Sequence, residues 1–467
     1  MTVMLSKNTS MLNLNDILLA TGGRQLSGKR HALIRSVSTD SRTLKRGDLF
    51  IALCGKNFDG HNFLRKVIAR SAAAIIVSKK VSLPHTDIPI IFVDDTTQAL
   101  GQIARFHRRR FKIPVIAITG SAGKTTTKEM IAAVLEKKYK VLKNIATLNN
   151  NIGVPMTLLK LNKTHKIVVV ELGTNHFGEI AQLAQIAEPT VSLLTNIGES
   201  HLEFLKTPAG VFKEKFNIIR RMQENGLVIF NKDDRFLRTI PNKAKGKEFI
   251  SFGIKSQSDI KAGNIQEPDS GSLCFTVNDR QKFCLQVFGS HNVYNALAAI
   301  SCGRLFKVND QKIKEALLEF KNLYGRGVFK KVKSWNILDD SYNANPMSLR
   351  SSIETLSRLK TKGRKILVCG DMLELGSKSE QLHRKIGKLV GRSNIDSIIT
   401  LGNLSKFISL EAKKQNKNLK SYHCHRIEHV HKILKSDLNS GDVILIKGSR
   451  GLRMERVIAL LKGKEEN

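Results

Sequence analysis

The stretch AITGSAGKTTTK, residues 117–128, decides the fold of the middle of this chain. It follows the apolar run PVIAIT (114–119), and it opens the helical pattern KTTTKEMIAAVLEKKY. A strand, a glycine turn and a helix N-terminus in this order form a cradle for phosphate. The usual phosphate loop carries one more glycine, where this chain has Ile118. Because strand, loop and helix stand in the right order, a chance glycine-rich turn is the weaker interpretation.

The loop predicts a binding site for a nucleoside triphosphate. Lys124 can reach the β- and γ-phosphates, and the Thr125 hydroxyl can bind Mg²⁺. We therefore expect the loop residues to bind the phosphates of a nucleotide: Gly120, Ser121, Ala122, Gly123, Lys124, Thr125 and Thr126.

The length of 467 residues indicates about three domains. We place them at 1–110, 111–326 and 327–467, with the basic run RRRFKIP (108–114) as a linker. Runs such as KIVVVELG (166–173) and TVSLLTNIG (190–198) alternate with helical segments, which predicts an α/β fold with a parallel sheet. The third region repeats this alternation and predicts a Rossmann-like domain. It lacks G-x-G-x-x-G after its first strand, so it need not bind a dinucleotide.

The chain is strongly basic, with 77 Lys and Arg against 40 Asp and Glu, a net charge of +37. These side chains are spread along the whole chain and aromatic residues make up only 6%, so the pattern favours anionic small substrates over nucleic acid. A nucleic-acid-binding P-loop protein remains the alternative from another class.

The six cysteines are scattered and lack C-x-x-C spacing, which predicts reduced thiols. The N-terminal residues show no signal-peptide pattern, and we find no run of 18 apolar residues. We therefore expect a cytoplasmic protein without a membrane span.

Further polar residues follow the predicted strands. Glu171 ends a strand at the edge where open α/β sheets bind ligands, although an acid there can simply face water. His201 could bind metal or phosphate, but a lone histidine is more often structural, and Lys215 would ordinarily be a solvated charge. Asn292 and Asn295 share a helical face and could contact adenine or cap the helix. The run HCHRIEHVH (423–431) is a weak metal candidate, with a polar surface as the default.

Several motifs occur together in one order across nearly the whole chain: TGSAGKTTTK, NNNIGVPMTLL, ELGTNHFGEI, HLEFL, GVFKEK, SHNVYNALAA, DDSYNANP and GDMLELG. In this combination the sequence resembles the Mur ligases, ATP-dependent amide-forming enzymes of peptidoglycan precursor synthesis. DDSYNANP and ELGTNHFGEI are similar to the members that add D-alanyl-D-alanine to UDP-N-acetylmuramoyl-tripeptide. The chain departs from the common family pattern at YGRGVFKK and at Leu205 and Lys206.

The resemblance implies a role for each matching residue. The metal ligands would be Thr125, Glu171, His201 and Lys215, with a carbamylated Lys215 and two Mg²⁺ ions. Lys124, Lys215, His201 and Asp340 would be catalytic, while Asn292, Asn295 and Arg326 would join the loop in binding ATP. Substrate contacts would come from Ser38, Asp40, Ser41, Arg42, Asn151, Asn343 and Asn345.

The resemblance also implies a reaction. The first domain would bind the UDP substrate, the central domain ATP, and the Rossmann-like domain the dipeptide. The tripeptide carboxylate would become an acyl phosphate that the D-alanyl-D-alanine amine attacks, as the third domain closes over the site. We expect a monomer with no nucleic-acid partner. A sibling ligase for another amino acid, or a folate-polyglutamating enzyme, remains an alternative.

Overall fold

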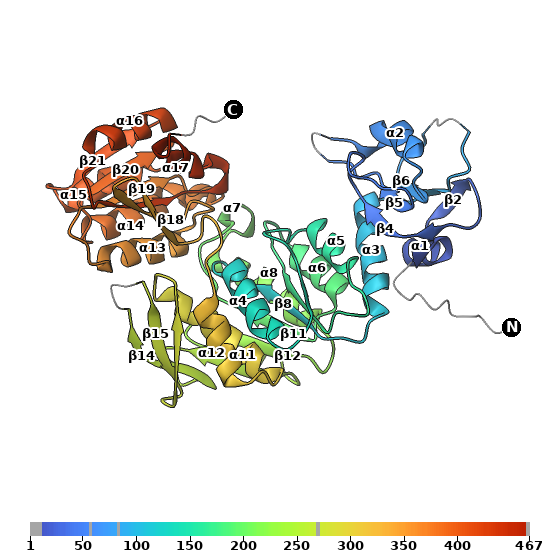
Figure 1. The fold of residues 1–467 in the computed structure, drawn as a ribbon, viewed down its shortest axis with the longest axis horizontal. Helices are drawn as coiled ribbons and strands as arrows, with labels where there is room; N and C mark the ends of the chain where they lie inside the picture. The colour runs from blue at the N-terminus through green and yellow to red at the C-terminus, as the bar shows by residue number, and fades with distance from the viewer. Residues whose placement is uncertain (1–11, 56–57, 82–84, 268–270, 464–467) are drawn as a thin grey trace.

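The computed structural model describes residues 12–55, 58–81, 85–267 and 271–463. Three large sheets follow one another along the described chain, and the central one lies between the other two (Figure 1). Residues 1–11, which belong to the N-terminal segment considered above for a signal peptide, lie outside the described residues. The predicted α/β class is confirmed in all three parts.

The first sheet has the strand order β2-β7-β6-β5-β4, and only β2 is antiparallel to its neighbour. The strands are β2 (Arg24–Ser27), β4 (Ser36–Ser38), β5 (Asp48–Ile51), β6 (Ala74–Val77) and β7 (Ile90–Phe92). Beside the sheet the chain forms α1 (Leu14–Thr21), η1 (Gly60–Phe63), α2 (Leu64–Ala69), α3 (Thr96–Arg109) and the pair β1 (Leu12–Asn13) and β3 (Leu33–Ile34). Ser38 ends β4 and precedes the predicted UDP-binding segment.

Helix α3 joins the first part to the central part, and its end differs from the predicted linker. Arg108 is buried at 3% exposure and donates to the carbonyls of Ala187, Phe111 and Ile113. Glu188 follows the central helix α6 (Glu179–Ala187) and binds Arg105 and Arg109 of α3. The basic run is therefore a docked junction, because its guanidinium groups satisfy carbonyls and a carboxylate of the central part.

The central sheet has nine strands in the order β16-β15-β14-β13-β12-β11-β8-β10-β9. Strands β8 to β14 run parallel, as predicted. Strands β14 to β16 form an antiparallel meander that the sequence pattern did not predict. The strands are β8 (Val115–Thr119), β9 (Val141–Lys143), β10 (Ile167–Glu171), β11 (Val191–Leu194), β12 (Leu227–Asn231), β13 (Glu248–Gly253), β14 (Ile260–Gln266), β15 (Leu273–Val277) and β16 (Gln281–Leu285).

Helices cover both faces of this sheet. Along β8, Val115 and Ala117 pack into one core cluster, and Ile116 and Ile118 pack into the other. This two-sided burial explains why the parallel strands read as continuous apolar runs. The helices are α4 (Lys124–Glu136), α5 (Gly153–Leu158), α6 (Glu179–Ala187), α7 (Leu202–Leu205), α8 (Pro208–Lys215), α9 (Asn217–Arg220), η2 (Leu237–Thr239), α10 (Ile240–Lys243), α11 (His291–Leu305) and α12 (Asp310–Glu319).

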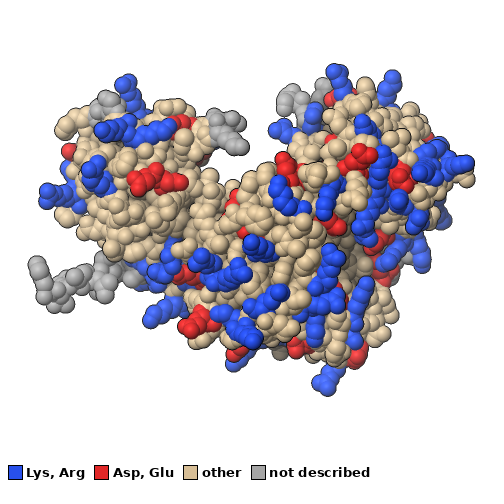
Figure 2. All heavy atoms as spheres, turned by 180° about the vertical axis from the view of Figure 1, so that it is seen from behind, with Lys and Arg blue, Asp and Glu red and all other residues tan. Residues whose placement is uncertain are grey.

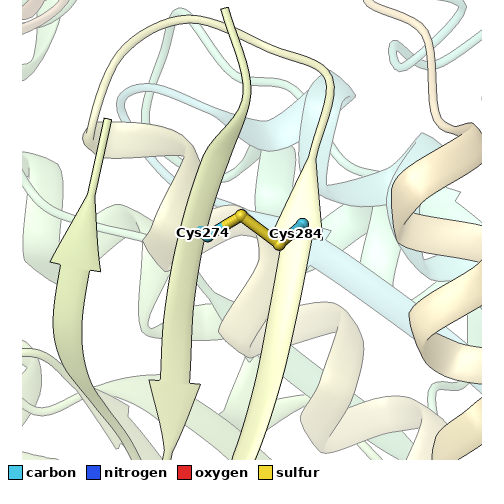
Figure 3. The surroundings of a disulfide bond; sticks show 2 residues. All are labelled: Cys274 and Cys284. Carbon is cyan, nitrogen blue, oxygen red and sulfur yellow. A yellow bond between two sulfur atoms is a disulfide. The ribbon is translucent and has the colours of Figure 1, made fainter. Parts of the chain in front are cut away.

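The meander carries a disulfide, Cys274–Cys284, which corrects the prediction of reduced thiols throughout (Figure 3). The two cysteines are direct partners in the antiparallel register of β15 and β16. Residues directly opposite on one face of such a pair bring their Cβ atoms close together. Ten residues of sequence separation gave no sign of this, because the pairing depends on the strand register.

The third sheet has the order β17-β18-β22-β19-β20-β21, and only β17 is antiparallel to its neighbour. The strands are β17 (Val328–Val332), β18 (Trp335–Asp339), β19 (Lys365–Gly370), β20 (Ser397–Leu401), β21 (Lys420–Cys424) and β22 (Val443–Lys447). The helices are α13 (Pro346–Arg358), η3 (Gly376–Lys378), α14 (Ser379–Gly391), α15 (Lys406–Gln415), α16 (Ile427–Asp437), η4 (Arg450–Leu452) and α17 (Glu455–Leu461).

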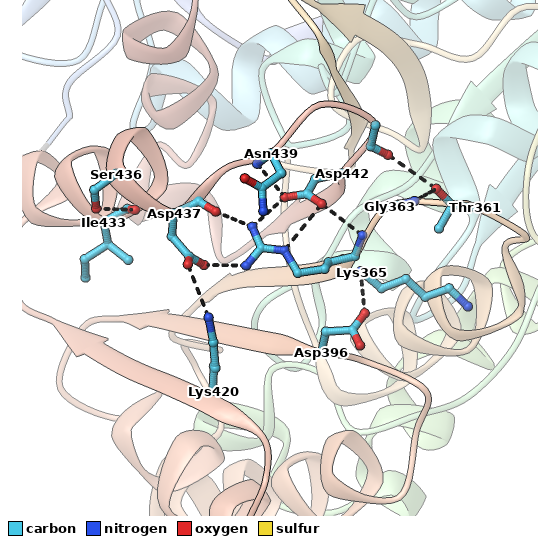
Figure 4. Close-up of polar contacts among 12 residues, drawn as sticks. Thr361, Gly363, Lys365, Asp396, Lys420, Ile433, Ser436, Asp437, Asn439 and Asp442 are labelled. Atoms are coloured by element: carbon cyan, nitrogen blue, oxygen red, sulfur yellow. Dashed lines mark hydrogen bonds and ion pairs between the residues drawn. The ribbon is translucent and has the colours of Figure 1, made fainter.

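An ion-pair network fixes the start of β19 against the end of α16 (Figure 4). Arg364 binds Asp442 at 2.7 Å and Asp437 at 3.0 Å, and Lys420 binds Asp437 at 3.4 Å. Asp442 is almost fully buried, so this bridge joins the amino ends of β19 and β22. The network lies at the end of the sheet where these strands begin, which leaves their carboxyl ends free to build a site.

The histidine-rich run does not form a metal site among the residues that the structure describes. His423 lies in β21 and binds Thr400, its neighbour Cys424 is buried, and His429 and His431 lie in α16. Within the described chain, no helix has both the length and the apolar character that crossing a bilayer requires.

Candidate active site

The phosphate loop leads from β8 into α4, as the sequence predicts. A Cβ atom at Gly120 would lie 1.9 Å from Thr195 Oγ1, so only glycine allows this close approach. Gly123 has φ +78° and stands at the N-cap of α4, where no side chain makes a capping hydrogen bond. The first turn of α4 therefore presents backbone N–H groups and its positive dipole end to a bound anion.

The segment after β11 supports this loop. Asn196 accepts from Ala122 N–H at 2.8 Å, and Thr195 Oγ1 donates to the Ala122 carbonyl at 2.7 Å. The Ser121 hydroxyl lies 3.0 Å from that of Ser200. Residues that follow β11 thus hold the loop in shape. His201 comes directly after Ser200, so it lies beside the loop.

Glu171 ends β10 beside the loop, and its two oxygens differ. Oε1 accepts from Asn149 at 2.7 Å, while Oε2 is buried and has no hydrogen-bond partner in the described chain. A buried carboxylate oxygen without a partner is costly. A cation bound there would satisfy it, and oxygen is the ligand that Mg²⁺ prefers.

Three basic groups surround this carboxylate. Lys124 Nζ donates to the Gly120 carbonyl at 2.9 Å, and burial lowers the pKa of Lys124. Lys215 is 1% exposed, and burial together with the charge of Lys124 lowers its pKa well below the ordinary value. Burial also lowers the pKa of His201, an effect that its hydrogen bond to Glu374 partly offsets. In each of these three groups, burial disfavours the charged form of the side chain.

The two asparagines of α11 line the same space. Asn295 accepts from the Thr127 hydroxyl at 2.9 Å and donates to Asn292 at 2.8 Å. Asn292 donates in turn to the Phe288 carbonyl. Neither side chain caps the helix, so of the two interpretations the capping one is wrong.

A second part of the wall comes from Asp233 and Tyr294. Asp233 accepts from the N–H groups of residues 254–256 and from the Tyr294 hydroxyl at 2.9 Å. These bonds fix the position of the Tyr294 ring beside Asn295 at the start of α11.

The third part of the chain closes the space from the other side. Asp340 binds Lys447 and accepts from Ser352 at 2.6 Å. Asn345 caps α13 and also donates to the carbonyl of Ser121 in the phosphate loop at 3.1 Å. Arg326 stacks over the ring of Tyr342, whose hydroxyl lies 2.5 Å from that of Thr147. Hydrogen bonds therefore join both halves of the site.

Together these groups line a cavity of about 580 Å³. It brings together most of the predicted ATP, metal and catalytic residues: Ser121, Ala122, Gly123, Lys124, Thr125, Thr126, Glu171, His201, Asn292, Asn295, Arg326, Asp340, Asn343 and Asn345. Gly120 and Lys215 lie behind the lining, where Gly120 opens the loop and Lys215 ends α8.

Other predicted residues lie elsewhere. In the first part of the chain, Ser38 ends β4 and is followed by Asp40, Ser41 and Arg42, and Asp40 binds Arg42 at 2.8 Å. Asn151 is exposed, and the asparagine of NNNIG that supports Glu171 is Asn149. At the two departures from the family pattern, Leu205 is buried and Lys206 is exposed.

Sequence reasoning missed several residues of the cavity wall, including Lys447, Asp233 and Tyr294. Lys447 carried a usable signal, because a lysine that ends the apolar run VILIK stands at the carboxyl edge of a buried strand. Glu374, the partner of His201, lies in the motif GDMLELG, but the motif alone did not indicate that this residue reaches His201 from another domain.

Comparison with known proteins finds matches in all three parts of the chain. Three family models match it: Mur ligase family, catalytic domain (33–108), Mur ligase middle domain (118–303), and Mur ligase, glutamate ligase domain (325–450). The UDP-N-acetylmuramoyl-tripeptide–D-alanyl-D-alanine ligase of Buchnera aphidicola subsp. Baizongia pistaciae is 37% identical, over 92% of each chain.

Solved structures agree over nearly the full length. MurF from Acinetobacter baumannii superposes with a TM-score of 0.87 at 32% identity, covering 96% of this chain and 98% of its own. MurF ligase from Thermotoga maritima, solved in complex with ADP, gives 0.82 at 29% identity, covering 92% of this chain and 97% of its own. With matching models in all three parts, a common fold and this identity, the chain belongs to the Mur ligase family.

Proposed function

We propose that this protein is an ATP-dependent, ADP-forming ligase that joins D-alanyl-D-alanine to UDP-N-acetylmuramoyl-tripeptide. The observation that carries the proposal is the cavity in which the phosphate loop faces the DDSYNANP segment. Relatives named for this reaction match over nine-tenths of the chain, and the reaction serves peptidoglycan precursor synthesis.

The reaction needs an activated carboxylate, because a free carboxylate is a poor electrophile. Transfer of the γ-phosphoryl group of ATP to the tripeptide carboxylate gives an acyl phosphate and ADP. The amine of D-alanyl-D-alanine attacks the acyl carbon, and phosphate leaves. The loop with Lys124 and the N-terminus of α4 holds the phosphates in line and offsets their charge. Asn292, Asn295 and Arg326 would bind the rest of the nucleotide.

The donor groups around Glu171 fit a divalent cation. The partnerless Oε2 of Glu171, the Thr125 hydroxyl, the His201 imidazole and a carbamylated Lys215 would hold Mg²⁺, in two sites. Bound Mg²⁺ would neutralise the phosphate charge that crowds the site. Lys215 suits carbamylation, because a buried neutral amine can add CO₂ and the resulting carbamate supplies oxygen donors. A carbon-13 carbamate signal in protein equilibrated with labelled bicarbonate, absent from K215A, would test this.

The third domain would bind the amine substrate. Asp340, Asn343 and Asn345 line the cavity opposite the phosphate loop, and Lys447 orients Asp340. Enclosure by this domain excludes water, which would otherwise hydrolyse the acyl phosphate. The first domain would hold the UDP group through Ser38, Asp40, Ser41 and Arg42, with Asn151 on the path of the peptide. We propose a monomer acting in the cytoplasm.

The test is phosphate release by the purified protein with ATP, Mg²⁺ and UDP-N-acetylmuramoyl-tripeptide, with and without D-alanyl-D-alanine. We expect release that requires both acceptor and dipeptide, with a UDP-pentapeptide product by mass spectrometry. Release only with a single amino acid and a shorter or folate acceptor would keep the fold and overturn the substrate assignment.

A further inference from the structure

The turn that follows β19 in the third domain reaches across to the central domain at Glu374. Its Oε2 lies 2.6 Å from Nδ1 of His201. Its backbone carbonyl accepts from the N–H of Glu203 at 3.0 Å, so side chain and main chain contact the same segment. In Figure 1, α7, which begins next to His201, lies against the third domain.

Both residues hold an unusual backbone conformation. His201 has φ +54° and Glu374 has φ +62°, in the left-handed region that residues other than glycine rarely adopt. Backbone of this kind persists only where its surroundings hold it, and it clusters at functional sites. Here the two turns place one carboxylate and one imidazole directly against each other across the domain boundary.

This contact decides which nitrogen of His201 is free. A carboxylate only accepts hydrogen bonds, so Nδ1 carries the hydrogen, and in the neutral imidazole Nε2 keeps its lone pair. His201 lines the nucleotide cavity, and no described residue hydrogen-bonds to Nε2. Carboxylates that bind the second nitrogen of a metal-binding histidine fix its tautomer and orientation.

We propose that Glu374 is a positioning residue: docking of the third domain orients His201 through Nδ1, so that Nε2 faces the cation and phosphates. Domain docking and assembly of the cation site thereby become one event. The inference rests on the proposed function, in which His201 is a cation ligand. It assigns a role to a residue of a different domain from the phosphate loop.

Variants at Glu374 separate orientation from charge. E374A removes the acceptor, whereas E374Q removes the charge but keeps an amide oxygen that can accept from Nδ1. E380Q is the matched control, because Glu380 is an exposed acid six residues further on that pairs with Arg384 on its own helix. Circular dichroism and thermal melting would establish that each variant is folded.

The readout is Mn²⁺ binding in the presence of ADP, followed by electron paramagnetic resonance. We expect E374A to weaken Mn²⁺ binding by about tenfold or more, as is typical for loss of such a partner. E374Q and E380Q should stay within about threefold of the wild type. The double variant H201A/E374A should bind as weakly as H201A alone, because Glu374 acts through His201.

Three outcomes would overturn the inference. E374A binding Mn²⁺ within twofold of the wild type would leave Glu374 as an interdomain contact only. Equal losses in E374A and E374Q would assign the effect to charge, and additive losses in the double variant would separate Glu374 from His201. Because the readout is metal binding, a failed substrate assignment in the ligation assay would leave this test intact.

Discussion

At the scale of single residues, the site combines groups that are costly for the fold. Lys215 is 1% exposed, and the attraction of Glu214 and Glu171 only partly offsets the burial of its amine. A buried ammonium is expensive, so burial lowers its pKa and disfavours the charged form. The fold gives up stability at this position, which is typical of functional residues.

We therefore expect K215M to separate stability from activity. Methionine fills similar space without a buried amine, so the melting temperature should hold or rise by a few degrees. The rate of phosphate release should fall about 10³-fold, because the site loses a donor. Calorimetry without nucleotide, together with the ligation assay, would check both. A melting temperature that falls along with activity would contradict this account.

Asp233, in contrast to Lys215, is a charged group that stabilises the fold. Burial alone would raise its pKa, but the N–H groups of Lys255, Ile254 and Ser256 hold the pKa at about 2, below the ordinary 3.8. The folded state thus binds fewer protons than the unfolded state between these values. The stabilisation is complete above about pH 4 and is lost as the pH falls towards 2.

D233A should lower stability by about 1–3 kcal/mol at pH 7, because three N–H groups lose their acceptor. The loss of stability between pH 4 and 2 should also become shallower than in the wild type. Denaturant unfolding at several pH values measures both effects. E224Q at an exposed carboxylate is the control, and an unchanged pH slope in D233A would refute the assignment.

At the scale of elements, a side chain fills the ligand crevice of the Rossmann-like third domain. Asp371 follows β19 and accepts from the N–H groups of Asn403, Leu404 and Ser405 at the start of α15. A Cβ at Gly402 would lie 2.5 Å from this carboxylate. In other Rossmann-like domains a helix start of this kind binds phosphate. Here the protein supplies its own carboxylate to the N–H groups at the helix start.

We expect D371A to destabilise the third domain by about 2–4 kcal/mol, because a buried charged acceptor and three N–H partners are lost together. Hydrogen exchange should show faster exchange in β19, β20 and α15, with the central sheet unchanged. E428A, at an exposed position on α16, should stay within about 0.5 kcal/mol of the wild type. Equal exchange throughout D371A would contradict the assignment.

At the scale of the whole molecule, the parts are joined in two ways. Helix α3 docks on the central part through Arg108, whereas the third part meets the phosphate loop through contacts such as Asn345 to Ser121. Lysines and arginines are spread over the face shown in Figure 2 and do not form one stripe. With a net charge of +37, the molecule attracts anions broadly.

This charge should make substrate capture sensitive to salt. Between about 50 and 300 mM KCl we expect the KM for the anionic UDP-tripeptide to rise several-fold, because salt screens the field. D-alanyl-D-alanine, a zwitterion with no net charge, is the internal control, and its KM should change little. Equal changes in both KM values would show that salt acts on the fold and not on the electrostatic attraction of the anionic substrate.

The sequence by itself determined the α/β class, the phosphate loop and the strands that support it, because glycine spacing and apolar period are local properties. Tertiary structure decided the rest. The Cys274–Cys284 disulfide depends on strand register, burial of Arg108 on how α3 docks, and the orientation of His201 on Glu374, 173 positions away in the chain. Such contacts join segments that only the packed fold brings together, so no local pattern encodes them.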